Sequence, residues 1–203
     1  MRTLNKLNTL EINNCNALFN NGDETHITKT RNVLEITEST FPKLKELIIR
    51  NCNNLKKITI NNHSYLEKII ITDNPMLEEV QIEANGVLKT VDLSGNNFLT
   101  KLKVNNNPVL TKLNIPTESI YTQLFITNHD KLTSVNSETE EANFAGVRID
   151  RNDANKIFSF AYNKAITTVK NLTYAGYGKG IFSYNRKISL IHDCSFEFYG
   201  ECS

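Results

Sequence analysis

The sequence predicts a β-rich solenoid of short parallel strands, with about 22 residues per coil, little helix and a single domain over residues 1–203. Two observations carry this prediction. From Leu44 to residue 120 an eleven-residue pattern repeats without insertion or deletion, and the segments FAYNKAITTV (160–169) and FSYNRKISLI (182–191) match each other at an offset of 22 residues. Fixed self-similarity of this kind is the sequence signature of a solenoid.

The chemistry of the repeat predicts which side chains face inward. Counting from Leu44, position one is Leu in every unit, and positions four and six are Leu, Ile or Val. Positions four and six flank a mostly polar position five, which is the period-two pattern of a short half-buried strand. We therefore expect positions one, four and six to point into the solenoid and position five to face solvent.

Eleven residues are too few to close a coil around a core, because known solenoid repeats need about twenty residues or more. One coil should therefore contain two units, with an extended segment on each side. We expect the units that begin at residues 44, 66, 88 and 110 to form one sheet, and those that begin at residues 55, 77, 99 and 121 to form the other.

Position nine follows the strand, where the chain turns and leaves backbone groups inside the coil. An amide side chain there can donate and accept hydrogen bonds at once, so stacked copies can pair these groups as a ladder. The same role is favoured for His63 and His129 over metal binding or catalysis. The predicted structural ladder contains Cys52, His63, Asn74, Asn85, Asn96 and Asn107.

The pattern can be followed beyond its most regular part, residues 44–131. LNTLEINNCNA (7–17) fits the repeat with Cys15 at position nine, and residues 18–30 interrupt it as a predicted loop insertion. Residues 157–195 carry the second repeat style, with the doubled period of 22 residues.

The phrases LKTVDLSGN (88–96), LTKLKVNNN (99–107) and LEKIIITDN (66–74) resemble the LxxLxLxxN hallmark of the leucine-rich repeat superfamily. The C-terminal phrases resemble the BspA-like bacterial branch. The resemblance covers about residues 7–195 and implies a right-handed coil, protein binding through an exposed strand face and a location at the cell surface or outside the cell. The N-terminus itself lacks the pattern of a signal peptide.

Composition argues against several other classes of function. The 23 basic and 22 acidic residues nearly cancel, which gives no electrostatic reason to expect nucleic acid or an anionic membrane as partner. No apolar run is long enough to span a bilayer, so membrane insertion is not expected. The four cysteines lack zinc-site spacing, and a disulfide between Cys194 and Cys202 is left open.

No catalytic constellation, metal site or cofactor motif is recognisable, so we expect no enzymatic activity and no cofactor. IHDC (191–194) places an imidazole near a thiol without a third residue to orient it.

A second candidate surface is the tyrosine set Tyr162, Tyr174, Tyr177 and Tyr184, since Tyr is favoured at binding surfaces.

The expected function is a non-catalytic recognition module that binds a protein, or a glycan, through one strand face. Ile48 and Ile70 stand at solvent positions and would form an apolar strip flanked by charges, as at the centre of an interface. The alternative is a structural subunit of a larger assembly, such as a virion or a cell-surface component; the partner and the oligomeric state are left open. The predicted partner-binding face contains Glu46, Ile48, Arg50, Lys68, Ile70, Thr72, Thr90, Asp92, Lys112 and Asn114.

Overall fold

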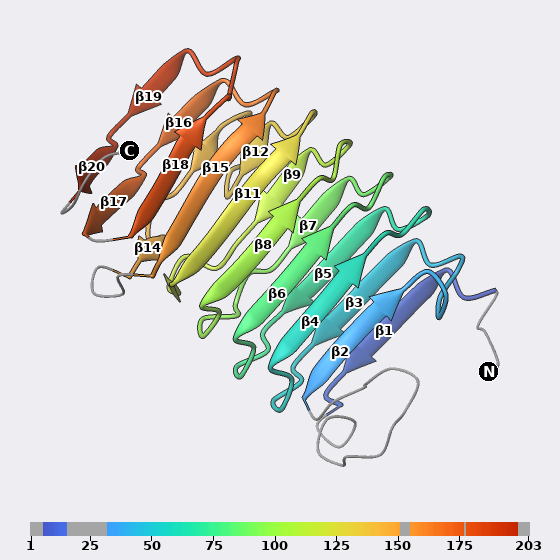
Figure 1. Cartoon of the computed structure of the whole chain (residues 1–203). Helices are drawn as coiled ribbons and strands as arrows, with labels where there is room; N and C mark the ends of the chain where they lie inside the picture. Colours follow the sequence, from blue (N-terminus) through green and yellow to red (C-terminus); the bar gives the residue numbers. More distant parts are fainter. Residues whose placement is uncertain (1–5, 16–31, 151–154, 177, 199–203) are drawn as a thin grey trace.

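The computed structural model describes residues 6–15, 32–150, 155–176 and 178–198. In these residues the chain winds as a parallel β-solenoid in which two sheets lie back to back (Figure 1). The chain alternates between the sheets as it advances along the axis, so the N-terminal and C-terminal coils lie at opposite ends. No helix occurs among these described residues.

The two main sheets and two short ones are built from parallel strand pairs. In spatial order the nine-stranded sheet contains β1 (Thr9–Asn13), β3 (Glu46–Arg50), β5 (Lys68–Thr72), β7 (Thr90–Asp92), β9 (Lys112–Asn114), β12 (Ser134–Val135), β13 (Ala142–Asn143), β16 (Thr168–Lys170) and β19 (Leu190–His192). The seven-stranded sheet contains β2 (Val33–Thr37), β4 (Lys57–Asn61), β6 (Glu79–Glu83), β8 (Lys101–Asn105), β11 (Gln123–His129), β15 (Ile157–Asn163) and β18 (Lys179–Ser183). The short sheets pair β10 (Ile120–Tyr121) with β14 (Arg148–Ile149), and β17 (Thr173–Gly176) with β20 (Ser195–Phe198).

The register of the strands has the predicted step of 22 residues. In the nine-stranded sheet Leu47 lies opposite Ile69, Ile69 opposite Val91, and Val91 opposite Leu113. The predicted coil length and the predicted division of the units between the two sheets are therefore confirmed.

Burial follows the repeat positions. The leucines at position one, from Leu44 to Leu110, have no exposed surface, and the side chains at positions four and six are at most 2% exposed. In β3 and β4 the side chains alternate between buried and half-buried, as expected for strands with one face on the core. The columns of stacked aliphatic side chains form one continuous core between the two sheets.

Position eight holds a backbone feature that the sequence prediction did not include. The residues there have positive φ in successive units: Asn51 (55°), Asn62 (58°), Asp73 (58°), Ala84 (55°), Gly95 (75°) and Asn106 (52°). The chain turns out of each strand through this left-handed conformation, which Gly, Asn and Asp tolerate better than other residues. The frequent Asn, Asp or Gly just before position nine was therefore a signal of the turn.

The looser segment after β11 stays in the solenoid but makes an extra pass. Strand β12 and strand β13 are neighbours in the nine-stranded sheet, and the backbone N–H of Val135 donates to the Glu141 carbonyl at 3.0 Å. In the seven-stranded sheet Gln123 consequently lies opposite Ile157, a step longer than 22 residues. The predicted loop insertion at residues 18–30 lies outside the described residues.

Candidate binding surfaces

Position nine in the nine-stranded sheet forms a buried column of hydrogen bonds. The backbone N–H of Cys52 donates to Asn74 Oδ1 at 3.0 Å, and that of Asn74 donates to Asn96 Oδ1 at 2.9 Å. Asn96 Nδ2 donates back to the Ile71 carbonyl on the preceding coil at 2.7 Å. Each amide thus pairs backbone groups that the turn leaves inside the coil.

A second column runs along the seven-stranded sheet. The backbone N–H groups of His63 and Asn85 donate to Asn85 Oδ1 (3.1 Å) and Asn107 Oδ1 (3.0 Å), respectively. Asn107 N–H lies 3.4 Å from His129 Nδ1, while His129 Nε2 lies 3.2 Å from the Val104 carbonyl. With its proton on Nε2, His129 accepts and donates as an asparagine does.

Burial keeps these imidazoles uncharged. It lowers the pKa of His129 to about 4, although the backbone carbonyls around the ring and Asp130 oppose the shift. Burial also lowers the pKa of His63, against the opposing charge of Glu38. The hydrogen bonds of the two columns join neighbouring coils, whereas His63 Nε2 is buried without a hydrogen-bond partner.

The residues of the predicted partner-binding face lie together on the outer surface of β3, β5, β7 and β9. Ile48 is in register with Ile70, and both are half-buried by their neighbours. Lys68 Nζ forms a 2.9 Å ion pair with Glu46, the residue opposite it. Thr72 differs from the expectation for an exposed face, because it is only 8% exposed.

The most exposed apolar side chains near the middle of the solenoid lie at a corner. Position eleven of alternate units carries Met76 (44% exposed), Phe98 (67%) and Ile120 (47%), where the chain leaves the nine-stranded sheet. Because they are one coil apart in sequence, these side chains form a row along the solenoid axis. We call Met76, Phe98 and Ile120 the corner ridge.

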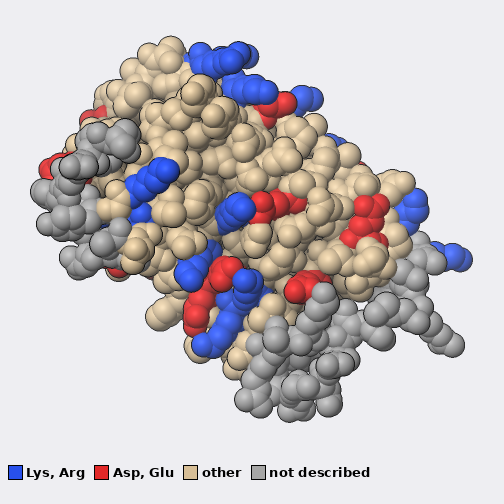
Figure 2. Space-filling model, in the orientation of Figure 1, with Lys and Arg blue, Asp and Glu red and all other residues tan. Residues whose placement is uncertain are grey.

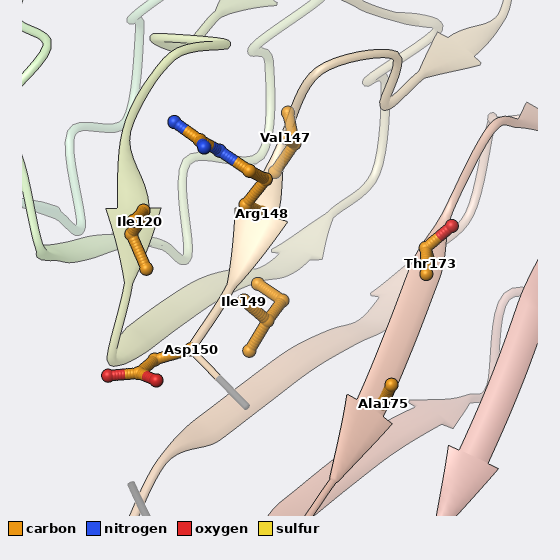
Figure 3. A pocket seen from close by; sticks show the side chains of 7 residues that line it. All are labelled: Ile120, Val147, Arg148, Ile149, Asp150, Thr173 and Ala175. Atoms are coloured by element: carbon orange, nitrogen blue, oxygen red, sulfur yellow. The ribbon is translucent and has the colours of Figure 1, made fainter. Parts of the chain in front are cut away.

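An apolar cavity of about 390 Å³ lies at the Ile120 end of the corner ridge (Figure 3). Its lining is Ile120, Val147, Arg148, Ile149, Asp150, Thr173 and Ala175, from β10, β14, β17 and adjoining turns. In Figure 3 the Ile149 side chain points toward the β17 side and the Arg148 side chain toward the β10 side. Arg148 Nη2 donates to the Glu118 carbonyl at 2.7 Å, which fixes a cation at the rim.

A polar hollow of about 450 Å³ lies beside the corner ridge, at the ends of β7, β9 and β12. Asn97 and Asn114 line it, as do Glu118 and Glu138. Asn97 Nδ2 donates to Glu118 Oε2 at 2.8 Å, and Glu138 forms a 2.7 Å ion pair with Lys112. Since Asn114 and Lys112 belong to the predicted partner-binding face, the hollow joins that face to the corner ridge.

The charged side chains on the seven-stranded face are mixed in sign. Figure 2 shows Lys and Arg interspersed with Asp and Glu over this face. Lys57 pairs with Glu79 at 2.7 Å, and Lys103 pairs with Glu83 at 2.9 Å. The Lys103 ammonium and neighbouring amide donors hold the pKa of Glu83 below its usual range, although partial burial opposes them.

Of the tyrosine set, the structure brings two members together on the surface. Tyr162 and Tyr184 stack with ring centroids 4.5 Å apart and planes 6° from parallel. They are 44% and 62% exposed, and both have positive φ (58° and 56°). Tyr174 is instead buried in the core, and Tyr177 lies outside the described residues.

The IHDC segment is engaged in local contacts. His192 Nδ1 lies 2.5 Å from Asp193 Oδ2, and Cys194 Sγ donates to the His192 carbonyl at 3.3 Å. Cys194 Sγ also accepts the backbone N–H of Leu172 at 3.4 Å, so the thiol occupies the place of a ladder side chain. Cys202, the proposed disulfide partner, lies outside the described residues.

The described residues contain no group of three or more His, Cys, Asp or Glu side chains arranged to hold a metal ion. They also contain no helix long and apolar enough to cross a membrane. Comparisons of the chain with protein-family models, curated proteins and solved structures find no match. The candidate surfaces are therefore interpreted from their own geometry.

Proposed function

We propose that this protein is a non-catalytic recognition module of the leucine-rich-repeat type, with BspA-like C-terminal repeats, that binds a protein partner at the corner ridge. Support for the family comes from the LxxLxLxxN strands and the buried amide columns that follow them. The observation that carries the binding proposal is the row of Met76, Phe98 and Ile120, with Phe98 67% exposed.

An apolar row of this kind is what the centre of a protein interface requires. Interface centres are enriched in Phe and Met, and their rims are polar. Here Ile120 borders the apolar cavity, while Asn97 and Glu118 line the polar hollow on the flank of Phe98. The surroundings favour a partner that inserts an apolar side chain into the cavity and places basic groups near Glu118 and Glu138.

The predicted partner-binding face then lies at the flank of the binding site, and the corner ridge forms its centre. Ile48 and Ile70 are half-buried, so they have less apolar surface to bury against a partner than Phe98 has. Lys112 and Asn114, near the polar hollow, would lie within reach of a partner seated on the corner ridge.

Site-specific photocrosslinking tests this proposal in extracts of the native source. A benzophenone side chain at position 98 should capture a protein partner, and the same probe at position 101, on the seven-stranded face, should not capture it. The purified partner should then bind the Phe98→Ser variant at least about tenfold more weakly, a loss of about 1.4 kcal/mol. Equal capture from both positions would overturn the proposal.

Tyr65→Ser is the matched control variant. Tyr65 is also an exposed position-eleven residue, at 41%, but it ends a unit of the seven-stranded sheet and therefore lies at the opposite corner. Its substitution should change the affinity less than about twofold. Equal losses for Phe98→Ser and Tyr65→Ser would refute the assignment of binding to the corner ridge.

A specific observation favours a second candidate function, a structural subunit of a larger assembly. In the last described coil Leu190 (47% exposed), Ile191 (51%) and Phe196 (39%) present apolar surface. Among the described residues, strands β18, β19 and β20 lie at edges of their sheets, and such parallel edges can template another chain. An apolar cavity of about 350 Å³, lined partly by Phe182 and Phe196, opens between these strands.

Light scattering on size-exclusion chromatography over a hundredfold concentration range separates the two candidates. A subunit of an assembly should grow in mass with concentration, and Ile191→Lys should abolish that growth. A mass of one chain throughout the range would argue against the second candidate and leave the recognition module.

A further inference from the structure

The first two coils carry a pair of cysteines in the column where the following coils carry asparagine. Cys15 follows β1, Cys52 follows β3, and the next residues of the column are Asn74 and Asn96. Asn13 of β1 lies opposite Arg50 of β3. Cys15 and Cys52 each follow two residues after this pair. The N–H of Asn14 continues the pairing by donating to the Arg50 carbonyl at 3.1 Å.

This register places the Cα atoms of the two cysteines at a spacing that a disulfide can bridge. Neighbouring parallel strands lie about 4.8 Å apart, and disulfides bridge Cα atoms about 4.4–6.8 Å apart. Cys52 Sγ already reaches across to the first coil, where it lies 4.0 Å from the Ile12 carbonyl. Both cysteines are reduced in this structure.

A thiol can fill a ladder place, as Cys194 does, but it pairs the backbone less firmly than an asparagine. An asparagine donates firmly to the carbonyl of the preceding coil, as Asn96 does to Ile71 at 2.7 Å. A thiol is a weak donor and a weak acceptor, so cysteine holds the first coil less well than asparagine would. Two adjacent cysteines can instead form a covalent bond, which asparagine cannot.

We propose that Cys15 and Cys52 form a thiol–disulfide exchange site, which oxidised glutathione or a similar low-molecular-weight disulfide converts into a covalent clasp between the first two coils. The Cys15 thiolate attacks one glutathione sulfur, forms a mixed disulfide and releases one glutathione thiolate. The Cys52 thiolate then attacks the Cys15 sulfur and releases the second. Two protein thiols lose two electrons and two protons, and one glutathione disulfide becomes two glutathione molecules.

Exposure sets this order of attack. Cys15 is half-buried and accessible to a small disulfide, whereas Cys52 has no exposed surface. Burial raises the pKa of the Cys52 thiol, although a hydrogen bond from the Cys15 backbone opposes the shift. Cys52 therefore acts second, when the mixed disulfide on Cys15 lies beside it.

The clasp would stabilise the first coil that the structure describes. Among the described residues, β1 is an edge of the nine-stranded sheet and is paired with β3 alone. Terminal coils of solenoids open first, because each coil is supported only by its neighbours. A bond between Cys15 and Cys52 would close residues 16–51 into a loop and oppose the separation of β1 from β3.

Peptide mapping after incubation with oxidised glutathione tests the site directly. We expect a linked peptide containing Cys15 and Cys52 in the unmodified chain and in the Cys194→Ser variant. Hydrogen exchange of the β1 amides should slow by about tenfold or more relative to the sample reduced with dithiothreitol.

Cys52→Asn is the matched control, because it restores the residue that the column carries at positions 74 and 96. This variant should fold, show no linked peptide and exchange its β1 amides at the same rate with and without oxidised glutathione. The proposal is overturned if Cys15 stops at the mixed disulfide, if either thiol pairs with another cysteine instead, or if neither reacts.

Discussion

The strongest test of the structure is the removal of one amide from the buried columns. Asn96 has no exposed surface, and its side chain bonds four backbone groups and the side-chain amide of Asn74. Its Oδ1 accepts from the Asn74 N–H at 2.9 Å, and its Nδ2 donates to the carbonyls of Ile71 (2.7 Å) and Leu93 (2.6 Å). Asn96→Ala deletes these three bonds together with two longer ones, from Asn74 Nδ2 (3.2 Å) and to the Ser94 carbonyl (3.5 Å).

The expected loss of stability follows from the groups left behind. A buried backbone group without a partner costs roughly 1–3 kcal/mol. The Asn74 N–H loses its acceptor, while the two carbonyls keep the capacity for other contacts, so we expect roughly 2–4 kcal/mol in total. Asn97→Ala is the control, since Asn97 is exposed and its side chain donates to the equally exposed Glu118 side chain.

Urea unfolding measures this difference. The chain has no Trp and seven Tyr, so circular dichroism and Tyr fluorescence are suitable probes of the β-structure and the aromatic packing. Coincident transitions would justify a two-state analysis of the free energy of unfolding. If the free energies of unfolding of Asn96→Ala and Asn97→Ala agree within about 0.5 kcal/mol, the buried columns do not hold the coils together.

Three further predictions concern packing, backbone and pH. Leu88→Ala should lower the free energy of unfolding by roughly 2–5 kcal/mol in urea, because it leaves a cavity in the stacked leucine column. Ala84→Gly should raise it by about 0.5–1 kcal/mol and Gly95→Ala should lower it by about 1 kcal/mol in the same assay, because both positions have positive φ, 55° and 75°. The unfolded chain protonates His129 near its ordinary pKa of 6.5, whereas the folded chain does so only near pH 4. Stability should therefore fall by about 3 kcal/mol between these pH values, and His129→Asn should remove most of this dependence in thermal melts.

The turn residues show how far a pattern can be read from sequence. The inward positions were predicted from the repeat, because alternation along a strand encodes which side chains share a face. The sharp turn at position eight was not predicted, although Asn51, Asn62 and Gly95 signalled it through their tolerance of positive φ. The signal lies within each unit, directly before the ladder residue of position nine.

The corner ridge could not be read in the same way. Position eleven is mostly apolar in the regular units, as positions four and six are, yet Phe98 is exposed and Leu102 is buried. A strand side chain has its direction fixed by alternation, whereas the direction of a corner side chain depends on how the chain passes between the two sheets. The cavity beside Ile120 likewise depends on β10, β14 and β17, which are separated in sequence and adjoin only after the coils have stacked.

By itself the sequence determined the coil length, the division of units between two sheets, the buried aliphatic columns and the placement of position nine for a ladder. Each of these repeats at a fixed period, so it is encoded locally in every unit. The tertiary structure alone decided the extra pass of β12 and β13, the exposure of the corner ridge and the approach of Cys15 to Cys52. The first and the last of these features arise where coils of unequal length meet, and the geometry of all three is set by contacts between residues distant in the chain.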